Sequence, residues 1–144
     1  MSKVKVQVDH LPSITTYRID AYQMRRNLEN CGIKWTYLKL DDSWYFYVSW
    51  EDWGKIFNHV QAKLPTYKSD KMDCDNFGDL IKVRVAELFG VNTCARVDGY
   101  WKGLRHAWNV FYDGENFYQL ESQKAGDLRD LIDDEYKPDM IFMG

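Results

Sequence analysis

Apolar and polar positions along the chain follow two different periods, and these predict strands and helices. Alternation with a period of two, which is typical of half-buried strands, occurs in residues 3–8, 35–40, 44–50, 105–112 and 115–121. Apolar residues at helical spacing occur in residues 17–30, 51–64 and 75–89. Residues 140–143 predict a short last strand, and the stretch from residue 90 to residue 104 is predicted to be a loop.

Two of the predicted strand pairs have the form of hairpins. Residues 35–40 and 44–50 are separated by three polar residues, so we expect them to pair with each other. The second hairpin, residues 105–121, contains Asp113-Gly114, a pair that favours a tight type I′ turn.

The turn of the second hairpin decides which residues face each other. If Asp113-Gly114 is a two-residue turn, His106 lies opposite Glu121, whereas a four-residue loop places His106 opposite Gln123. In both registers His106 and Glu121 share one face of the sheet, because side chains alternate with a period of two. The sequence therefore predicts a histidine beside a carboxylate.

Composition and charge restrict the class of protein. The 144 residues are 45% hydrophobic and 16% aromatic, which excludes a disordered chain and predicts one domain, residues 1–144. Within it we distinguish an N-terminal α/β subregion, 1–66, from a core, 67–144, that carries the candidate chemistry. The net charge of −3 and the pI near 5.6 argue against a general nucleic-acid binder. No apolar run reaches the ~20 residues that span a membrane, so no membrane partner is expected.

The cysteines predict a reducing compartment. There are three, an odd number, and no two have the C-x-x-C spacing of zinc ribbons or redox motifs. The first residues alternate charge with valine, unlike the continuous apolar run of a signal peptide. We therefore expect a cytoplasmic protein with free thiols.

Cys74 stands at the start of the third predicted helix, about 60° from the core-facing Phe77. The unpaired N–H groups and the dipole of the first helical turn favour a thiolate at this place. The neighbouring carboxylates of Asp73 and Asp75 oppose it. A cation would decide the balance, either protonated His106 or a metal ion. A cysteine at a helix start followed by a histidine beside a carboxylate has the logic of nucleophile, base and orienting group.

The residues around these positions resemble a known family. The sequence resembles a small papain-like cysteine-peptidase family related to the C-terminal calcium-dependent domain of the fairy-ring mushroom agglutinin and to phage and bacterial homologues. The matching segments are Tyr67-Lys68-Ser69-Asp70, Met72-Asp73-Cys74-Asp75-Asn76-Phe77-Gly78 and His106-Ala107-Trp108-Asn109.

This resemblance implies an α+β, papain-like fold in which the helix that bears the cysteine packs on a small antiparallel sheet. It implies a cysteine hydrolase, a peptidase or amidase, that acts on a peptide or protein substrate and is activated by a divalent cation. Cys74 would be the nucleophile, His106 the general base and Glu121 the third catalytic residue. Asp75 and Glu121 would bind Ca²⁺, which prefers oxygen ligands.

Simpler interpretations stand beside these. Cys74 can be a buried core thiol, and Asp73 and Asp75 can be helix-capping residues. The alternative function is a non-catalytic binding or accessory phage-type protein that retains the fold. Such a protein would use the aromatic N-terminal half to bind a sugar or a protein partner.

Overall fold

The computed structural model describes residues 10–144, so the strand predicted at residues 3–8 lies outside the described residues. The elements in chain order are β1 (Tyr17–Asp20), α1 (Ala21–Glu29), β2 (Tyr37–Leu40), β3 (Trp44–Tyr47), α2 (Trp50–Val60), α3 (Cys74–Phe89), β4 (Cys94–Trp101), β5 (Leu104–Tyr112), β6 (Phe117–Leu120), β7 (Leu128–Asp130) and β8 (Tyr136–Met143).

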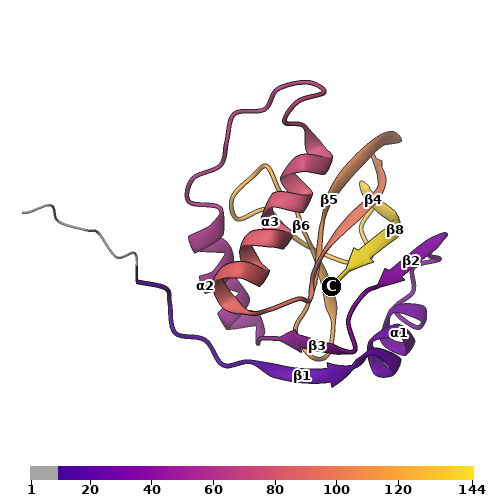
Figure 1. The fold of residues 1–144 in the computed structure, drawn as a ribbon. Coiled ribbons are helices and arrows are strands. Elements are labelled where there is room, and N and C mark those ends of the chain that lie inside the picture. Colours follow the sequence, from indigo (N-terminus) through magenta and orange to yellow (C-terminus); the bar gives the residue numbers. More distant parts are fainter. Residues whose placement is uncertain (1–9) are drawn as a thin grey trace, which may run out of the picture.

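The strands form two sheets. The larger sheet has six strands in the order β2-β8-β4-β5-β6-β7, and the smaller one pairs β1 with β3 (Figure 1). In the larger sheet β2 runs parallel to β8, whereas the other neighbouring pairs are antiparallel. The protein is therefore mostly β, and the prediction of a papain-like α+β fold with a small antiparallel sheet is wrong.

The main cause of this difference is β4, which the sequence analysis treated as a loop. The Asp98-Gly99 pair resembles a turn, but the register of β4 against β8 shifts between these two residues, so they form an irregularity within a strand. Gly99 lies against β8 so closely that an added Cβ would be 2.2 Å from the Lys137 carbonyl oxygen. Only glycine fits such an approach of two backbones.

The prediction that residues 35–40 and 44–50 form a hairpin is also wrong. β2 pairs with β8, and β3 pairs with β1, so residues 41–43 connect two sheets. The backbone N–H of Asp41 donates to the Met143 carbonyl at 3.1 Å, and the Ala21 N–H donates to the Ser43 carbonyl at 2.9 Å. These bonds hold the connection against β8 and against the first residue of α1.

The predicted helices are present, but their ends differ: α1 is shorter at both ends, α2 ends earlier, and α2 and α3 each begin one residue before the predicted start. α1 begins at Ala21 rather than at residue 17, because the Asp20 side chain accepts the Gln23 N–H and caps the helix. Ser49 caps α2 in the same way through the Asp52 N–H. α3 ends at Gly90, whose φ of 66° is the left-handed conformation that glycine adopts easily. Within residues 10–144 no helix is long and apolar enough to cross a membrane.

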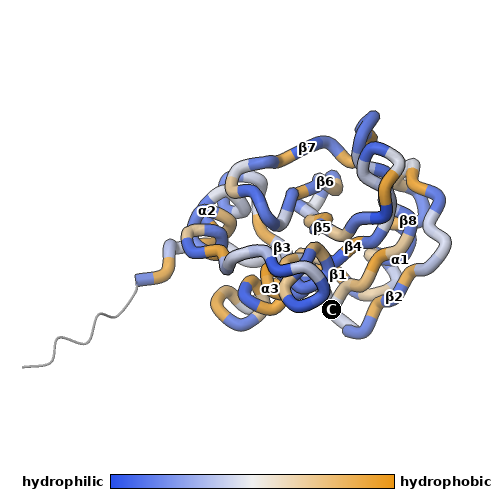
Figure 2. The backbone as a smooth tube through the Cα atoms, turned by 90° about the horizontal axis from the view of Figure 1, so that it is seen from above, coloured by the Kyte–Doolittle hydropathy of each residue, from blue (hydrophilic) through white to orange (hydrophobic). Residues whose placement is uncertain are grey.

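The core lies on both faces of the larger sheet. One apolar cluster packs α1 residues such as Met24 and Leu28 against Trp108 of β5, and the other packs α2 and α3 against the Phe111 side of the same strand. Figure 1 shows α2 and α3 side by side in front of the sheet. In Figure 2 polar and apolar residues alternate along these helices, as expected for helices with one buried side. The proposed subregions 1–66 and 67–144 thus both contribute to these clusters, and their boundary stays a prediction.

Candidate functional site

His106 and Glu121, the predicted pair, lie together. The β5–β6 connection is the four-residue loop, since Tyr112 pairs with Phe117, and the register continues to Asn109 opposite Leu120. The His106 Nε2 and the Glu121 Oε1 are 2.6 Å apart, and both side chains are largely buried. The sequence prediction that these residues share one face is confirmed.

Tyr136 of β8 and two tryptophans complete this cluster. The Tyr136 hydroxyl donates to the Glu121 Oε1 at 3.2 Å. Burial, together with the negative charge of Glu121, raises the pKa of Tyr136, so it stays a protonated donor. The His106 ring stacks on Trp108, with centroids 5.6 Å apart, and Trp101 stands 5.8 Å away. The arrangement fixes the orientation of the imidazole.

Cys74 begins α3, as predicted, and its thiol is half-buried. Burial raises the pKa of the Cys74 thiol, and the charges of Asp73 and Asp75 act in the same direction. The Ala107 N–H opposes this shift by hydrogen bonding to the sulfur. Among the described residues no hydrogen bond joins Cys74 to His106. The raised pKa agrees with the effect expected of Asp73 and Asp75 in the absence of a cation, and the lowered pKa expected with a cation bound stays a prediction.

Labelling of the thiols can measure this shift. We expect iodoacetamide to react slowly with Cys74 at neutral pH, and the rate to rise through about pH 9 without reaching a plateau, because a raised pKa keeps the thiol protonated there. Site-resolved mass spectrometry of the native protein gives the rate at each pH. A plateau already reached below about pH 8 would contradict the raised pKa.

The predicted calcium ligands make other contacts. A hydrogen bond between the carboxyl groups of Asp73 and Asp75 raises the pKa of the first and lowers that of the second. Both oxygens of Glu121 are engaged, Oε1 as described and Oε2 by the Gln123 N–H at 3.1 Å. In the part of the chain that the structure describes, no three His, Cys, Asp or Glu side chains gather into a possible metal site. These residues do not fit a bound Ca²⁺ in this arrangement, and the pair Asp75 and Glu121 stays a prediction.

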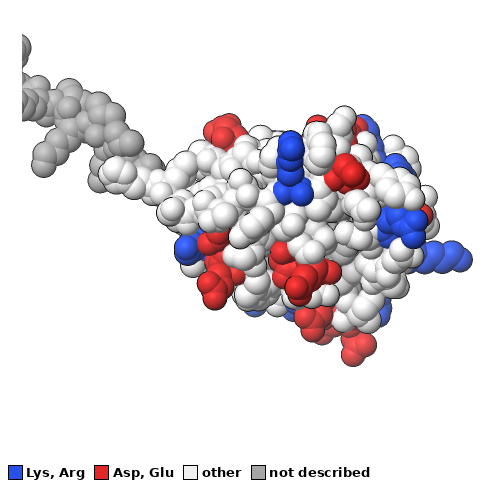
Figure 3. Space-filling view, turned by 90° about the horizontal axis from the view of Figure 1, so that it is seen from below, with Lys and Arg blue, Asp and Glu red and all other residues white. Residues whose placement is uncertain are grey.

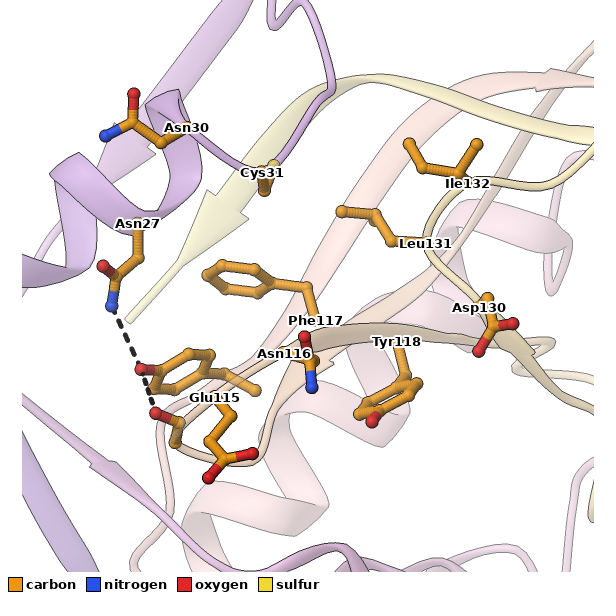
Figure 4. Close-up of a pocket in the computed structure, with 12 residues that line it drawn as sticks. Asn27, Asn30, Cys31, Glu115, Asn116, Phe117, Tyr118, Asp130, Leu131 and Ile132 are labelled. Carbon is orange, nitrogen blue, oxygen red and sulfur yellow. Dashed lines mark hydrogen bonds between the residues drawn. The ribbon is translucent and has the colours of Figure 1, made fainter.

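A second candidate site lies at the other end of the β5–β6 hairpin. We call it the aromatic groove and define it by Trp50, Glu115, Asn116, Tyr118 and Asp130. Three hollows of about 750, 430 and 410 Å³ are lined in part by these residues. Figure 4 shows the largest, in which side chains of α1 face those of β6 and of residues 130–132.

Stacked rings form the floor of the groove. The Trp50 indole lies with its centroid 4.5 Å from the Tyr118 ring and 5.9 Å from the Phe111 ring, yet 44% of Trp50 is exposed. On the α1 side, Asn27 donates to the Tyr112 hydroxyl at 3.0 Å, and this hydroxyl donates to the Gly114 carbonyl at 2.7 Å (Figure 4). The rings and the hairpin turn are thus held in place from both sides.

Polar side chains stand unpaired around these rings. Glu115, Asn116 and Asp130 are exposed, and within residues 10–144 their side chains form no hydrogen bond or ion pair. The turn that carries the first two is fixed by Asp113, whose side chain accepts the N–H groups of both at 2.9 and 2.8 Å. An exposed indole with free amide and carboxylate groups beside a hollow can bind a small polar ligand.

The sequence analysis did not identify this groove. A signal existed in the strand alternation, since Tyr118 stands between the buried Phe117 and Gln119 and must point to the outer side. Trp50 was likewise placed within a strand, although it directly follows the capping Ser49 and begins α2. Nothing local showed that the two rings meet.

Comparisons with known proteins give a fold but no family. No protein-family model matches the sequence, and no curated protein matches it. The structure is similar to that of Polyporus squamosus lectin PSL1a in a complex with E64, with a TM-score of 0.72 and 18% identity over 86% of this chain and 50% of the lectin chain. A second structure of this lectin, bound to the epitope Neu5Acα2-6Galβ1-4GlcNAc, gives a TM-score of 0.59 and 18% identity over 80% of this chain and 48% of the other. The chain thus spans about half the length of these neighbours, and the likeness concerns the fold.

These findings correct the predicted family and activity. The similar structures are those of a lectin, whereas the sequence predicted a papain-like cysteine peptidase related to the mushroom agglutinin domain. The hydrolase assignment, with its peptide substrate, falls with that family. Within the chain, burial raises the pKa of the Cys74 thiol, and the catalytic roles predicted for Cys74, His106 and Glu121 stay predictions.

Proposed function

We propose that this chain is a non-catalytic binding protein whose ligand is a carbohydrate held in the aromatic groove. The observation that carries the proposal is the exposed indole of Trp50, which packs at a tilt against Tyr118 in a groove that also holds the unpaired polar groups of Asn116 and Asp130.

A sugar ring matches these groups in chemistry. A pyranose presents one face of C–H groups, which packs on an aromatic ring, and a rim of hydroxyl groups, which both donate and accept hydrogen bonds. Carboxylates accept, and amides accept and donate, so Asp130, Glu115 and Asn116 can bind such a rim. The Trp50 and Tyr118 rings supply flat area with little conformational freedom to lose.

The groove is also organised in advance of binding. Trp50 is anchored by its neighbours in the first turn of α2 and by two rings beneath it. The turn carrying Glu115 is fixed by Asp113, and the Asp130 backbone is held by a buried glutamine, Gln119, at 3.1 Å. Groups that do not need to be ordered on binding lose less free energy when the ligand arrives.

The structural comparisons favour the same ligand class. One of the similar structures is a lectin bound to a sialylated trisaccharide, and binding without turnover was the alternative function predicted from the sequence. That ligand belongs to the lectin. For this chain the carbohydrate proposal rests on its own groove.

Binding to glycans tests the proposal directly. The labelled protein is applied to an array of mono- and oligosaccharides, and binding of the strongest one is then measured by titration calorimetry. We expect Trp50→Ala to weaken that binding at least about tenfold, because the ring on which the sugar packs is lost.

Trp44→Ala is the matched control. Trp44 is also 44% exposed, but it lies on β3 under Arg18 and does not line the groove. Its removal should leave the affinity unchanged, and thermal melts show whether both variants are folded. Absence of binding to every sugar, or equal affinities for the wild type and Trp50→Ala, would refute the proposal.

A further inference from the structure

The charges around the aromatic groove are almost entirely negative. Glu115 and Asp130 line it without a cationic partner, and Asp113 and Asp133 line its borders. Figure 3 shows the molecule from below, with acidic groups near the centre of this face and single basic side chains among them. A ligand in the groove therefore meets a negative potential.

The one basic side chain among the described residues that line these hollows is already occupied. Arg129 donates from Nε to Asp127 at 3.0 Å, and its Nη1 stands 3.7 Å from Asp133 and 3.5 Å from Glu135. Its guanidinium also lies over the Tyr136 ring, 4.4 Å from the centroid. Pairing Arg129 with a ligand anion would require breaking these contacts.

Resting on the carbohydrate proposal, we infer that the groove selects amino sugars, whose ammonium groups pair with Glu115 or with Asp130, and rejects sugars that carry a carboxylate. An ammonium group beside either unpaired carboxylate is attracted by it. A sugar carboxylate at the same place is repelled and finds no free cation. The preferred ligand class thus differs from the sialylated ligand of the lectin structure.

Three oligosaccharides of similar length separate the charge states. These are a glucosamine trisaccharide, its N-acetylated form and a sialylated trisaccharide, titrated at about pH 6 in low salt, where the amine is protonated and the carboxylates are charged. We expect the glucosamine trisaccharide to bind about tenfold more tightly than the N-acetylated one, and the sialylated one to bind least. The preference should shrink as salt is added.

The double variant Glu115→Gln/Asp130→Asn keeps the shape of the groove and removes both charges. It should bind the charged and N-acetylated trisaccharides equally. The control variant Glu87→Gln/Asp70→Asn removes two charges at exposed positions that do not line the groove. It should still bind the glucosamine trisaccharide more tightly than the N-acetylated one. This control separates the effect of the groove carboxylates from that of the net charge of the protein.

The outcomes of these titrations test the amino-sugar inference and the carbohydrate proposal separately. If the three trisaccharides bind through Trp50 with equal affinities, whatever their charge, the inference is overturned and the carbohydrate proposal still stands. Loss of the preference in Glu87→Gln/Asp70→Asn would also overturn it, because general attraction to an acidic protein would then be the cause. If none of the three sugars binds while another sugar of the array does, the inference alone is refuted, and if no sugar of the array binds, the proposed function is refuted as well.

Discussion

Gly99→Ala is expected to lower the free energy of unfolding by about 3 kcal/mol or more. The added Cβ would lie 2.2 Å from the Lys137 carbonyl oxygen and 2.7 Å from the Pro138 Cα, and both are backbone atoms of β8. They cannot move aside like a flexible side chain, so β4 and β8 must separate in the middle of the sheet. Urea unfolding followed by tryptophan fluorescence measures the change.

Gly54→Ala is the control for this substitution. Gly54 lies within α2 with open space around its Cα, and no atom lies within 4 Å of an added Cβ. Alanine there should raise stability by about 0.5–1 kcal/mol, since glycine is a poor helix former. A Gly99→Ala protein as stable as the wild type would mean that β4 and β8 are not in this register.

Gln119→Leu is expected to lower the free energy of unfolding by about 3–5 kcal/mol. The buried Gln119 side chain accepts the Trp108 indole N–H at 2.7 Å and donates to the Asp130, Leu131 and Tyr136 carbonyls at 3.1, 3.1 and 3.4 Å. Leucine has a similar volume but leaves these four groups without a partner in the core. Because Asp130 and Leu131 line the groove, sugar binding should weaken as well.

Gln123→Leu provides the comparison. Gln123 is half-buried, and its side chain has no hydrogen-bond partner within the described chain. The same substitution there should change stability by less than about 0.5 kcal/mol. Equal effects at the two positions would contradict the role of the Gln119 network.

The elements that the sequence predicted well are those with local signals. Ser49 marks the start of α2 and Gly90 marks the end of α3. Each forms its hydrogen bond with a residue only three or four positions away in the sequence. The contact of His106 with Glu121 could be predicted for a similar reason. It depends only on the period of a strand and on one short connection, and it holds for either loop length.

The pairing of distant strands could not be predicted in this way. β2 ends four residues before β3 begins, which favours a hairpin, but its partner is β8, far along the chain. Residues 94–101 were predicted to be a loop because the dipeptide Asp98-Gly99 is typical of a turn. In the structure Gly99 instead allows β4 to lie close against β8. The groove depends on the same kind of information, since Asn27, Trp50, Tyr118 and Asp130 come from four separate segments.

The place of β8 has a consequence for the order of folding. β8 lies between β2 and β4 and is the strand that pairs with β2. Tyr37 of β2 therefore has no strand partner until Met140, about 100 residues later, has been synthesised. The hairpins of β4, β5 and β6 can form as soon as they are synthesised, because their partners are consecutive in the chain. On the ribosome β1 and β3 can therefore pair early, whereas β2 remains unpaired while the second half of the chain assembles, and its exposed edge needs protection from aggregation until β8 is synthesised.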